Sequence, residues 1–174
     1  NKGGTFRKWY GNAVWVLDYG LDGNNVLVSG GQLSNQHLYG RSHVSWTRVS
    51  SRMNLRYYKE GVFFDNTSPA ILENTEFLLA YLNSTVGEFN RQGKFSGTKI
   101  EAGHVQSIAP FVMADLVRKD IERLANLLVA LSIGDWDSYE ISWDFTNLSL
   151  LSMDHSNPTT LKSTYQKIRV NWRG

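Results

Sequence analysis

Apolar and polar positions alternate at several places in the first half of the chain, which is the spacing of half-buried β-strands. Residues 44–49 show this alternation most clearly. Other runs rich in Val, Trp, Tyr and Phe end at turn residues, and the short spacing around Lys59-Glu60-Gly61 predicts a hairpin. The predicted strands are residues 13–19, 25–29, 44–49, 55–58 and 62–64.

Helical spacing dominates the second half. Between Asp115 and Leu131 apolar residues recur every three or four positions, so we expect a helix that buries this Leu/Ile stripe and stops at Gly134. The pattern predicts an α/β (mixed α+β) fold, with a twisted, mostly antiparallel or mixed sheet from the first half and helices from the second. The other predicted elements are helices over 75–82, over 86–91 and from 159 onward, and a connector over 100–110.

Composition narrows the class of protein. The 174 residues are 41% hydrophobic and include no cysteine, which removes disulfides, thiolate zinc sites and a cysteine nucleophile, and fits a cytoplasmic setting. No apolar run approaches the ~18 residues of a membrane span. The chain opens on Asn1 instead of an initiator methionine, so we expect it to be part of a longer protein.

Charge is divided unevenly along the chain. Residues 1–60 carry eight Lys/Arg and three Asp/Glu, a net of +5, whereas residues 61–174 carry ten and thirteen, a net of −3. A basic half joined to an acidic half favours one face for a polyanion, although chance can produce the same division.

Motifs for catalysis or metal binding do not emerge. The four histidines are scattered without metal-ligand spacing, and the glycine pairs do not lead into a phosphate-binding loop. An acidic run between Asp135 and Asp144 can serve as paired carboxylates, but a solvated helix start is the simpler interpretation. The residues alone therefore indicate a binding region with no catalytic, cofactor or metal site.

Two clusters combine cations, aromatic rings and hydroxyls in the way that DNA-binding surfaces do. They are residues 6–12 and 41–52. Lys, Arg and hydroxyl groups bind phosphates, and Arg also pairs with guanine. The alternative is a twisted strand whose polar residues face water. The candidate DNA contacts are Arg7, Lys8, Arg41, Ser42, Thr47, Arg48, Ser50, Ser51 and Arg52. Asn12, Gln32, Asn35, Gln36 and Asn54 are amides that can read bases, and Lys94, Lys99 and His104 are the next cations to consider.

Three stretches resemble one protein family, and a fourth resembles a helix found more widely. Residues 2–12, 44–65 and 135–145 are similar to blocks of the BREX (phage-growth-limitation type) adenine-specific DNA methyltransferases, and residues 78–84 are similar to a helix of target-recognition domains. The resemblance implies methyl transfer from S-adenosylmethionine to the exocyclic amine of adenine. That chemistry needs an Asn-Pro-Pro-Tyr-like motif, whereas Asn157-Pro158-Thr159-Thr160 lacks the second proline and the aromatic ring.

What the resemblance implies is therefore recognition without catalysis. We expect a target-recognition domain at 1–145 and the start of an extension at 146–174, with S-adenosylmethionine held by a catalytic domain outside this chain. The implied partners are double-stranded DNA, the methyltransferase domain of the same polypeptide and other phage-defence proteins. A recognition domain of another restriction–modification enzyme and a protein-interaction module remain as alternatives.

Overall fold

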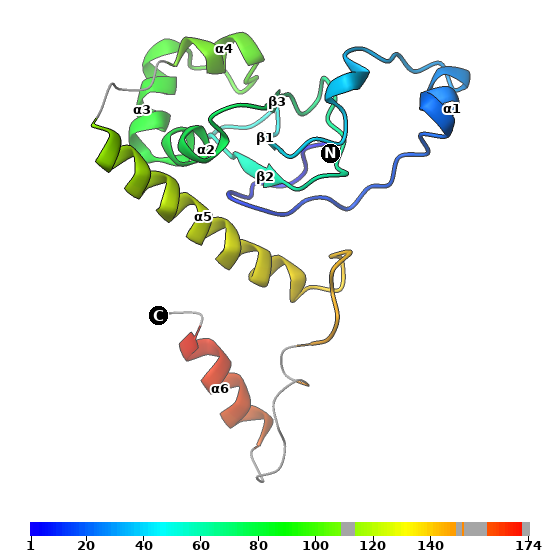
Figure 1. Cartoon of the computed structure of the whole chain (residues 1–174). Coiled ribbons are helices and arrows are strands. Elements are labelled where there is room, and N and C mark those ends of the chain that lie inside the picture. The colour runs from blue at the N-terminus through cyan, green and yellow to red at the C-terminus, as the bar shows by residue number, and fades with distance from the viewer. Residues whose placement is uncertain (109–113, 149–150, 152–159, 172–174) are drawn as a thin grey trace. The chain divides into compact units, whose positions relative to one another are not determined.

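A three-stranded antiparallel sheet forms the centre of the first part of the chain (Figure 1). Its strands are β1 (His43–Ser45), β2 (Arg56–Tyr58) and β3 (Ala70–Ile71), in the order β2-β1-β3. Val44 of β1 lies opposite Tyr57 on one side and Ile71 on the other. The predicted mixture of an antiparallel sheet from the first half and helices mainly from the second is confirmed. β1 and β2 are shorter than their patterns indicated, and β3 lies where no strand was predicted.

The computed structural model describes all residues except 109–113, 149–150, 152–159 and 172–174. Contacts divide the chain into two units, Asn1–Ile133 and Gly134–Gly174. A division by contacts is not a functional boundary, so the expected domain end at residue 145 stays a prediction. The Asn-Pro sequence at 157–158 lies outside the described residues.

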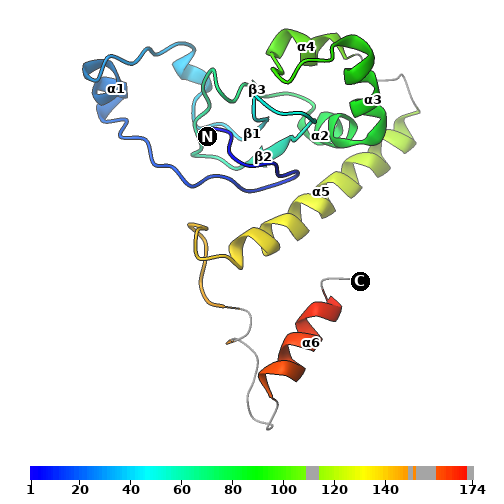
Figure 2. The ribbon, with the colours of Figure 1, turned by 180° about the vertical axis from the view of Figure 1, so that it is seen from behind.

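The structure corrects three strand predictions, two of them in the stretch before the sheet. The residues 13–20 form no regular element, and Asn24–Val28 is the short helix α1, preceded by the 3₁₀ turn η1 (Leu21–Gly23). Residues 62–64 do not form a strand either, so the hairpin predicted around Lys59-Glu60-Gly61 is not formed. A strand needs a pairing partner, and local apolar content does not supply one. Both views show the segment that contains α1 leaving the sheet on the side away from α3 (Thr85–Lys94) and α4 (Ala102–Ser107) (Figures 1 and 2).

The helices after the sheet follow local signals more closely. α2 (Thr75–Asn83) begins where predicted, and Ser84 accepts a hydrogen bond from the Gly87 N–H at 3.1 Å, which caps α3. The connector expected at 100–110 is wrong, because it contains α4, whose start is closed by a capping box between Glu101 and His104. Near the end of the chain, α6 (Leu161–Asn171) agrees with the predicted final helix.

The hydrophobic core of the first unit lies between the sheet, α2 and α4. Trp46 is 2% exposed, and its indole N–H donates to the Ile100 carbonyl at 2.8 Å. A buried indole thus keeps its polar atom bonded while its ring fills the core. Buried leucines from both sides complete the packing, namely Leu55, Leu79 and Leu82.

The long helix α5 (Asp115–Asp137) contradicts the expected burial of its stripe. Ala125 and Val129 are buried, with Ile121 and Ile133 partly so, but most of the leucines face solvent. The apolar residues of α5 cover a wider arc of the helix surface than the core does. Only one side of that arc is therefore packed against the core. The helix also passes through Gly134, and the acidic run begins at its end, not at a helix start. The exposed members are Leu116, Val117, Leu124, Leu127, Leu128 and Leu131.

Among the described residues, the structure contains no helix with the length and apolar character needed to span a bilayer.

Candidate nucleic-acid interface

A buried arginine joins the first residues of the chain to the sheet. The Arg56 side chain has no exposed surface, and its guanidinium donates to the Arg7 carbonyl at 3.0 Å, the Thr47 hydroxyl at 3.0 Å and the Tyr58 hydroxyl at 2.9 Å. Trp9 adds two backbone hydrogen bonds beside β2, donating to the Leu55 carbonyl at 2.9 Å and accepting from the Tyr57 N–H at 2.8 Å. The stretch that carries the first family resemblance is therefore fixed against the sheet.

Two candidate cations, Arg7 and Lys8, are used inside the molecule. Lys8 donates from its ammonium to the Asn83 carbonyl at 2.7 Å, and Arg7 donates from Nε to the Tyr10 carbonyl at 3.0 Å. Burial lowers the pKa of Lys8 below its usual value, because desolvation outweighs the attraction of Glu88. Both side chains are only half-exposed, so their first role is to hold the chain in place.

Two loops from distant parts of the sequence lie side by side and form an exposed edge. Ser50 donates its N–H to the Thr98 carbonyl at 2.8 Å, and Ile100 donates to the Arg48 carbonyl at 2.6 Å. We call residues 48–52 and 94–100 the paired-loop edge. Its exposed members combine three cations with hydroxyls that can bind phosphate oxygens. Its exposed polar and charged side chains are Ser51, Arg52, Lys94, Ser96, Thr98 and Lys99, and Val49 is exposed beside them.

Behind this edge, a buried ion pair holds both loops. Arg91 is 3% exposed and donates to the Ser51 carbonyl at 3.1 Å, to the Gly97 carbonyl at 3.4 Å and to the Glu88 carboxylate at 2.7 Å. Glu88 also accepts the Met53 N–H at 2.9 Å. Burial alone would raise the pKa of Glu88, but the hydrogen bonds from Arg91, Met53 and Gln92 outweigh it and hold the pKa below its ordinary value. A fixed backbone of this kind reduces the entropy lost when a ligand binds.

Arg48 lies at one end of the paired-loop edge and is partly neutralised. Its guanidinium donates to the Glu101 carboxylate at 2.7 Å, and the Lys99 ammonium lies 3.3 Å from the same carboxylate oxygen. The hydrogen bond from Arg48 lowers the pKa of Glu101, so the acid is ionised at neutral pH. Arg48 is thus better placed to orient this corner than to offer a free positive charge.

The DNA-contact residues predicted from sequence lie in different parts of the structure. Arg48, Ser50, Ser51 and Arg52 lie in the paired-loop edge. Arg41 and Ser42 are exposed but precede β1 at its opposite end. The seven residue-to-residue steps from Arg41 to Arg48 correspond to roughly 20 Å in an extended chain. Thr47 is engaged with Arg56 and with the Gly4 carbonyl at 3.3 Å. The nine candidates therefore do not form one surface.

The sequence did not single out the ion pair behind the paired-loop edge, and it gave two cations of the edge only a secondary place. Glu88 and Arg91 are three residues apart, which on a helix is the ordinary spacing of a solvent-exposed ion pair. Lys94 and Lys99 were named only as secondary candidates, because their pairing with residues 48–52 depends on contacts across about 50 positions of the chain. The spacing of Glu88 and Arg91 was the one signal available for the buried pair.

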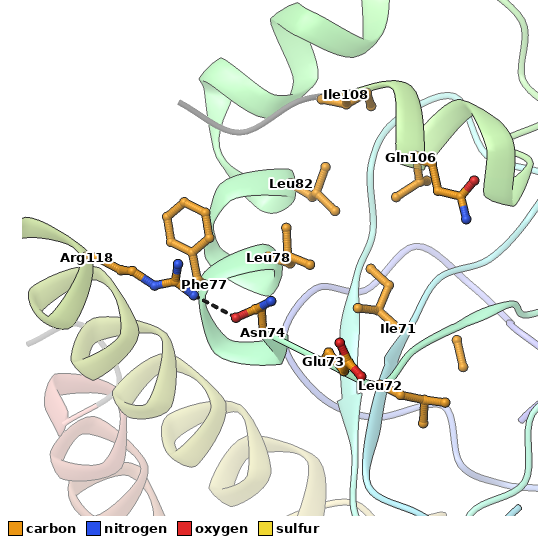
Figure 3. A pocket seen from close by; sticks show the side chains of 12 residues that line it. Ile71, Leu72, Glu73, Asn74, Phe77, Leu78, Leu82, Gln106, Ile108 and Arg118 are labelled. Carbon is orange, nitrogen blue, oxygen red and sulfur yellow. Dashed lines mark hydrogen bonds between the residues drawn. The ribbon is translucent and has the colours of Figure 1, made fainter. Parts of the chain in front are cut away.

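A larger cavity lies elsewhere, between α2, α4 and the start of α5 (Figure 3). It has a volume of about 550 Å³, and leucine and isoleucine side chains such as Ile71, Leu78 and Ile108 form much of its wall. At its border Arg118 donates to the Asn74 side chain at 2.9 Å and to Glu122 at 2.8 Å. The cavity offers apolar surface and one paired cation, so it does not compete with the paired-loop edge for a polyanion.

Comparison with known proteins places the chain beside methyltransferases. No family model matches. The chain is 29% identical over 182 aligned residues to the adenine-specific methyltransferase PglX of Lacticaseibacillus casei (strain Zhang), covering 96% of the chain and 15% of that protein. It is also 29% identical over 157 residues to the adenine-specific methyltransferase BrxX of Escherichia coli O9:H4 (strain HS), covering 86% of the chain and 13% of that protein. The resemblance stated from sequence is confirmed: the chain is similar over most of its length to one region of two adenine-specific methyltransferases, and it spans about one seventh of the length of each.

Proposed function

We propose that this region recognises the DNA target of an adenine-N6 methyltransferase of bacterial phage defence. The observation that carries the proposal is the paired-loop edge, where Arg52, Lys94 and Lys99 stand beside exposed hydroxyls on a backbone held by Arg91. S-adenosylmethionine and the transfer step belong, in this proposal, to parts of the enzyme outside this chain. The relatives' names support a methyltransferase role, and DNA recognition is the step that we add.

The chemistry of the edge suits phosphate contacts first and base contacts second. The two acids next to the edge are already engaged, because Glu101 is paired with Arg48 and Lys99, and Glu88 with Arg91. Neither carboxylate is free to oppose an incoming phosphate. Ser51 and Thr98 can donate to phosphate oxygens. Arg52 is exposed and long enough to pair with guanine.

Protein docking is a second candidate role for a different surface. Six large apolar side chains of α5 are exposed, from Leu116 at 75% to Leu128 at 38%. Exposed apolar patches of this kind mark interaction sites more often than ordinary surface. Such a face suits the methyltransferase domain of the same enzyme or another phage-defence protein, and it does not conflict with DNA binding at the paired-loop edge.

Fluorescence anisotropy with a labelled duplex tests the proposal. The chain should bind the duplex, and the affinity should fall steeply as salt rises from about 50 to 200 mM, because phosphate contacts release counterions. A competing heparin-like polyanion controls for simple charge attraction. Absence of duplex binding at low salt, with the chain folded by circular dichroism, would leave protein docking as the better assignment.

A further inference from the structure

The sheet ends at β3 without a further strand beside it. In the order β2-β1-β3, one side of β3 is hydrogen-bonded to β1, and within the described part of the chain no backbone hydrogen bond reaches the other side of residues 70–73. In an antiparallel ladder every second residue directs its N–H and C=O away from the neighbouring strand. The outer side of β3 is therefore an open edge, which can pair with a strand of another chain.

The cavity of Figure 3 follows this open edge. Five consecutive residues, 70–74, line it. Successive side chains of a strand point to opposite faces, so a cavity lined by a run of consecutive residues must follow their backbone. Its volume of about 550 Å³ leaves room for added side chains, and Leu78, Val105 and Ile108 make another part of its wall apolar. The space suits an extended segment with apolar side chains.

A segment with matching properties is present in the same chain. Residues 13–17 have the composition of a strand but form no regular element, and their backbone makes no hydrogen bond to any residue that the structure describes. Four of their side chains are apolar and exposed, from Val14 at 39% to Val16 at 75%. The local sequence favours a strand here, and the fold of a single chain supplies no strand to pair with it.

This segment starts at the side of the sheet opposite to β3. Trp9 is hydrogen-bonded beside β2, and the chain continues from there to α1 (Figures 1 and 2). β1 lies between β2 and β3, which places these two strands roughly 10 Å apart. Pairing of the segment with β3 therefore joins two copies of the chain.

Charges at the two surfaces are complementary. At the border of the cavity, Glu73 is exposed and makes no ion pair with a described residue, and Arg118 donates from Nε and Nη2 but has no described acceptor at Nη1. The segment carries one charge of each sign: Asp18 follows it directly, and the Lys2 ammonium lies 5.5 Å from the centroid of the Trp15 ring. Each border charge thus meets an opposite charge near the segment, which favours association.

We propose that residues 13–17 of one copy add to the open edge of β3 of a second copy as a fourth strand, with apolar side chains in the cavity. The two surfaces differ, so the contact is head-to-tail and association can continue beyond a dimer as concentration rises. No residue of the paired-loop edge takes part, and the proposal does not depend on DNA binding.

Sedimentation velocity over a concentration series of the whole chain tests the contact. The weight-average mass should rise with concentration. An excess of a synthetic peptide of residues 12–19 should return it to the mass of one chain, because the peptide pairs with β3 in place of the second copy. The same peptide N-methylated at Val14–Leu17 keeps its side chains but lacks the backbone donors of a ladder, so it should have no effect.

Two variants separate this contact from the apolar face of α5. Val14→Pro, Leu17→Pro removes two backbone donors at exposed positions outside the core and should give a single chain at every concentration. Leu127→Gln, on the exposed face of α5, is the matched control and should associate like the unaltered chain.

The remaining outcomes contradict the proposal. An unaltered chain that stays monomeric overturns it, as does association that persists in the folded proline variant. Equal competition by the plain and the N-methylated peptide shows that no strand ladder forms. Association that is lost in Leu127→Gln and kept in the proline variant assigns the contact to α5.

Discussion

Asn83 shows how one polar side chain can join two parts of a small fold. The residue is 4% exposed and ends α2, yet its amide donates to the Leu55 carbonyl at 2.9 Å and accepts the Leu55 N–H at 2.9 Å. Its own carbonyl accepts from Lys8 at 2.7 Å. The helix, the residue before β2 and the N-terminal stretch thus meet at one amide. The asparagine in the Leu-Asn-Ser block is therefore a structural connector.

Replacement of Asn83 by Ala should lower the free energy of unfolding by about 2–3 kcal/mol, because the Leu55 N–H and carbonyl lose their partners inside the fold. Chemical denaturation monitored by circular dichroism measures the change. Asn24→Ala, at an exposed amide in α1, is the matched control and should alter stability by less than about 0.5 kcal/mol. Equal effects of the two substitutions would contradict the connector role.

Glu88 should make stability depend on pH in the acid range. Its pKa in the folded chain lies below the ordinary value of 4.5, so its contribution is present above that value and is lost as pH falls through the folded pKa. Glu88→Gln should cost about 2 kcal/mol at pH 7, and the difference from the unaltered chain should shrink in more acidic solution. Denaturation series from neutral to acid pH measure it. A difference that grows as pH falls would mean that the pKa is raised.

Among the elements, those with strong local signals were predictable and those that depend on pairing were not. α2 follows from its apolar spacing and α5 from the run after Asp115, both within one stretch of sequence. The segment from Ala13 to Ser29 has the composition of strands, yet it has no neighbouring strand and forms α1 instead. Amino-acid composition indicates a preference for the strand conformation, but a strand forms only where another strand pairs with it.

The two sides of α5 should respond differently to substitution. Val129 is 9% exposed and belongs to the core, so Val129→Ala should cost about 1–2 kcal/mol. Leu131 is 62% exposed, and Leu131→Gln should change the stability of the isolated chain by less than about 0.5 kcal/mol. Thermal and denaturant unfolding of both variants give the comparison. A large cost at Leu131 would mean that the predicted burial of the whole stripe holds in solution.

For the whole molecule, the candidate site was partly predictable. Arg48 to Arg52 form one run of cations and hydroxyls, which sequence alone can single out. The contribution of Lys94 and Lys99 depends on the pairing of Val49 with Lys99, and the buried Arg91 behind them looks like any surface cation in the sequence. The parts of the site that could not be predicted depend on tertiary contacts: the pairing of the two loops and the support that Arg91 gives them.

The salt dependence of DNA binding should therefore report the paired-loop edge as a unit. Each phosphate-contacting cation contributes about one to the slope of log affinity against log salt, so the triple variant Arg52→Ala, Lys94→Ala, Lys99→Ala should lower that slope by about three. Lys119→Ala, an exposed cation on α5, is the control and should leave it unchanged. Arg41→Ala provides the decisive comparison, because Arg41 precedes the other end of β1. If Arg41→Ala lowers the slope while the folded triple variant retains it, the DNA face lies at that end of the sheet and the paired-loop edge has another role.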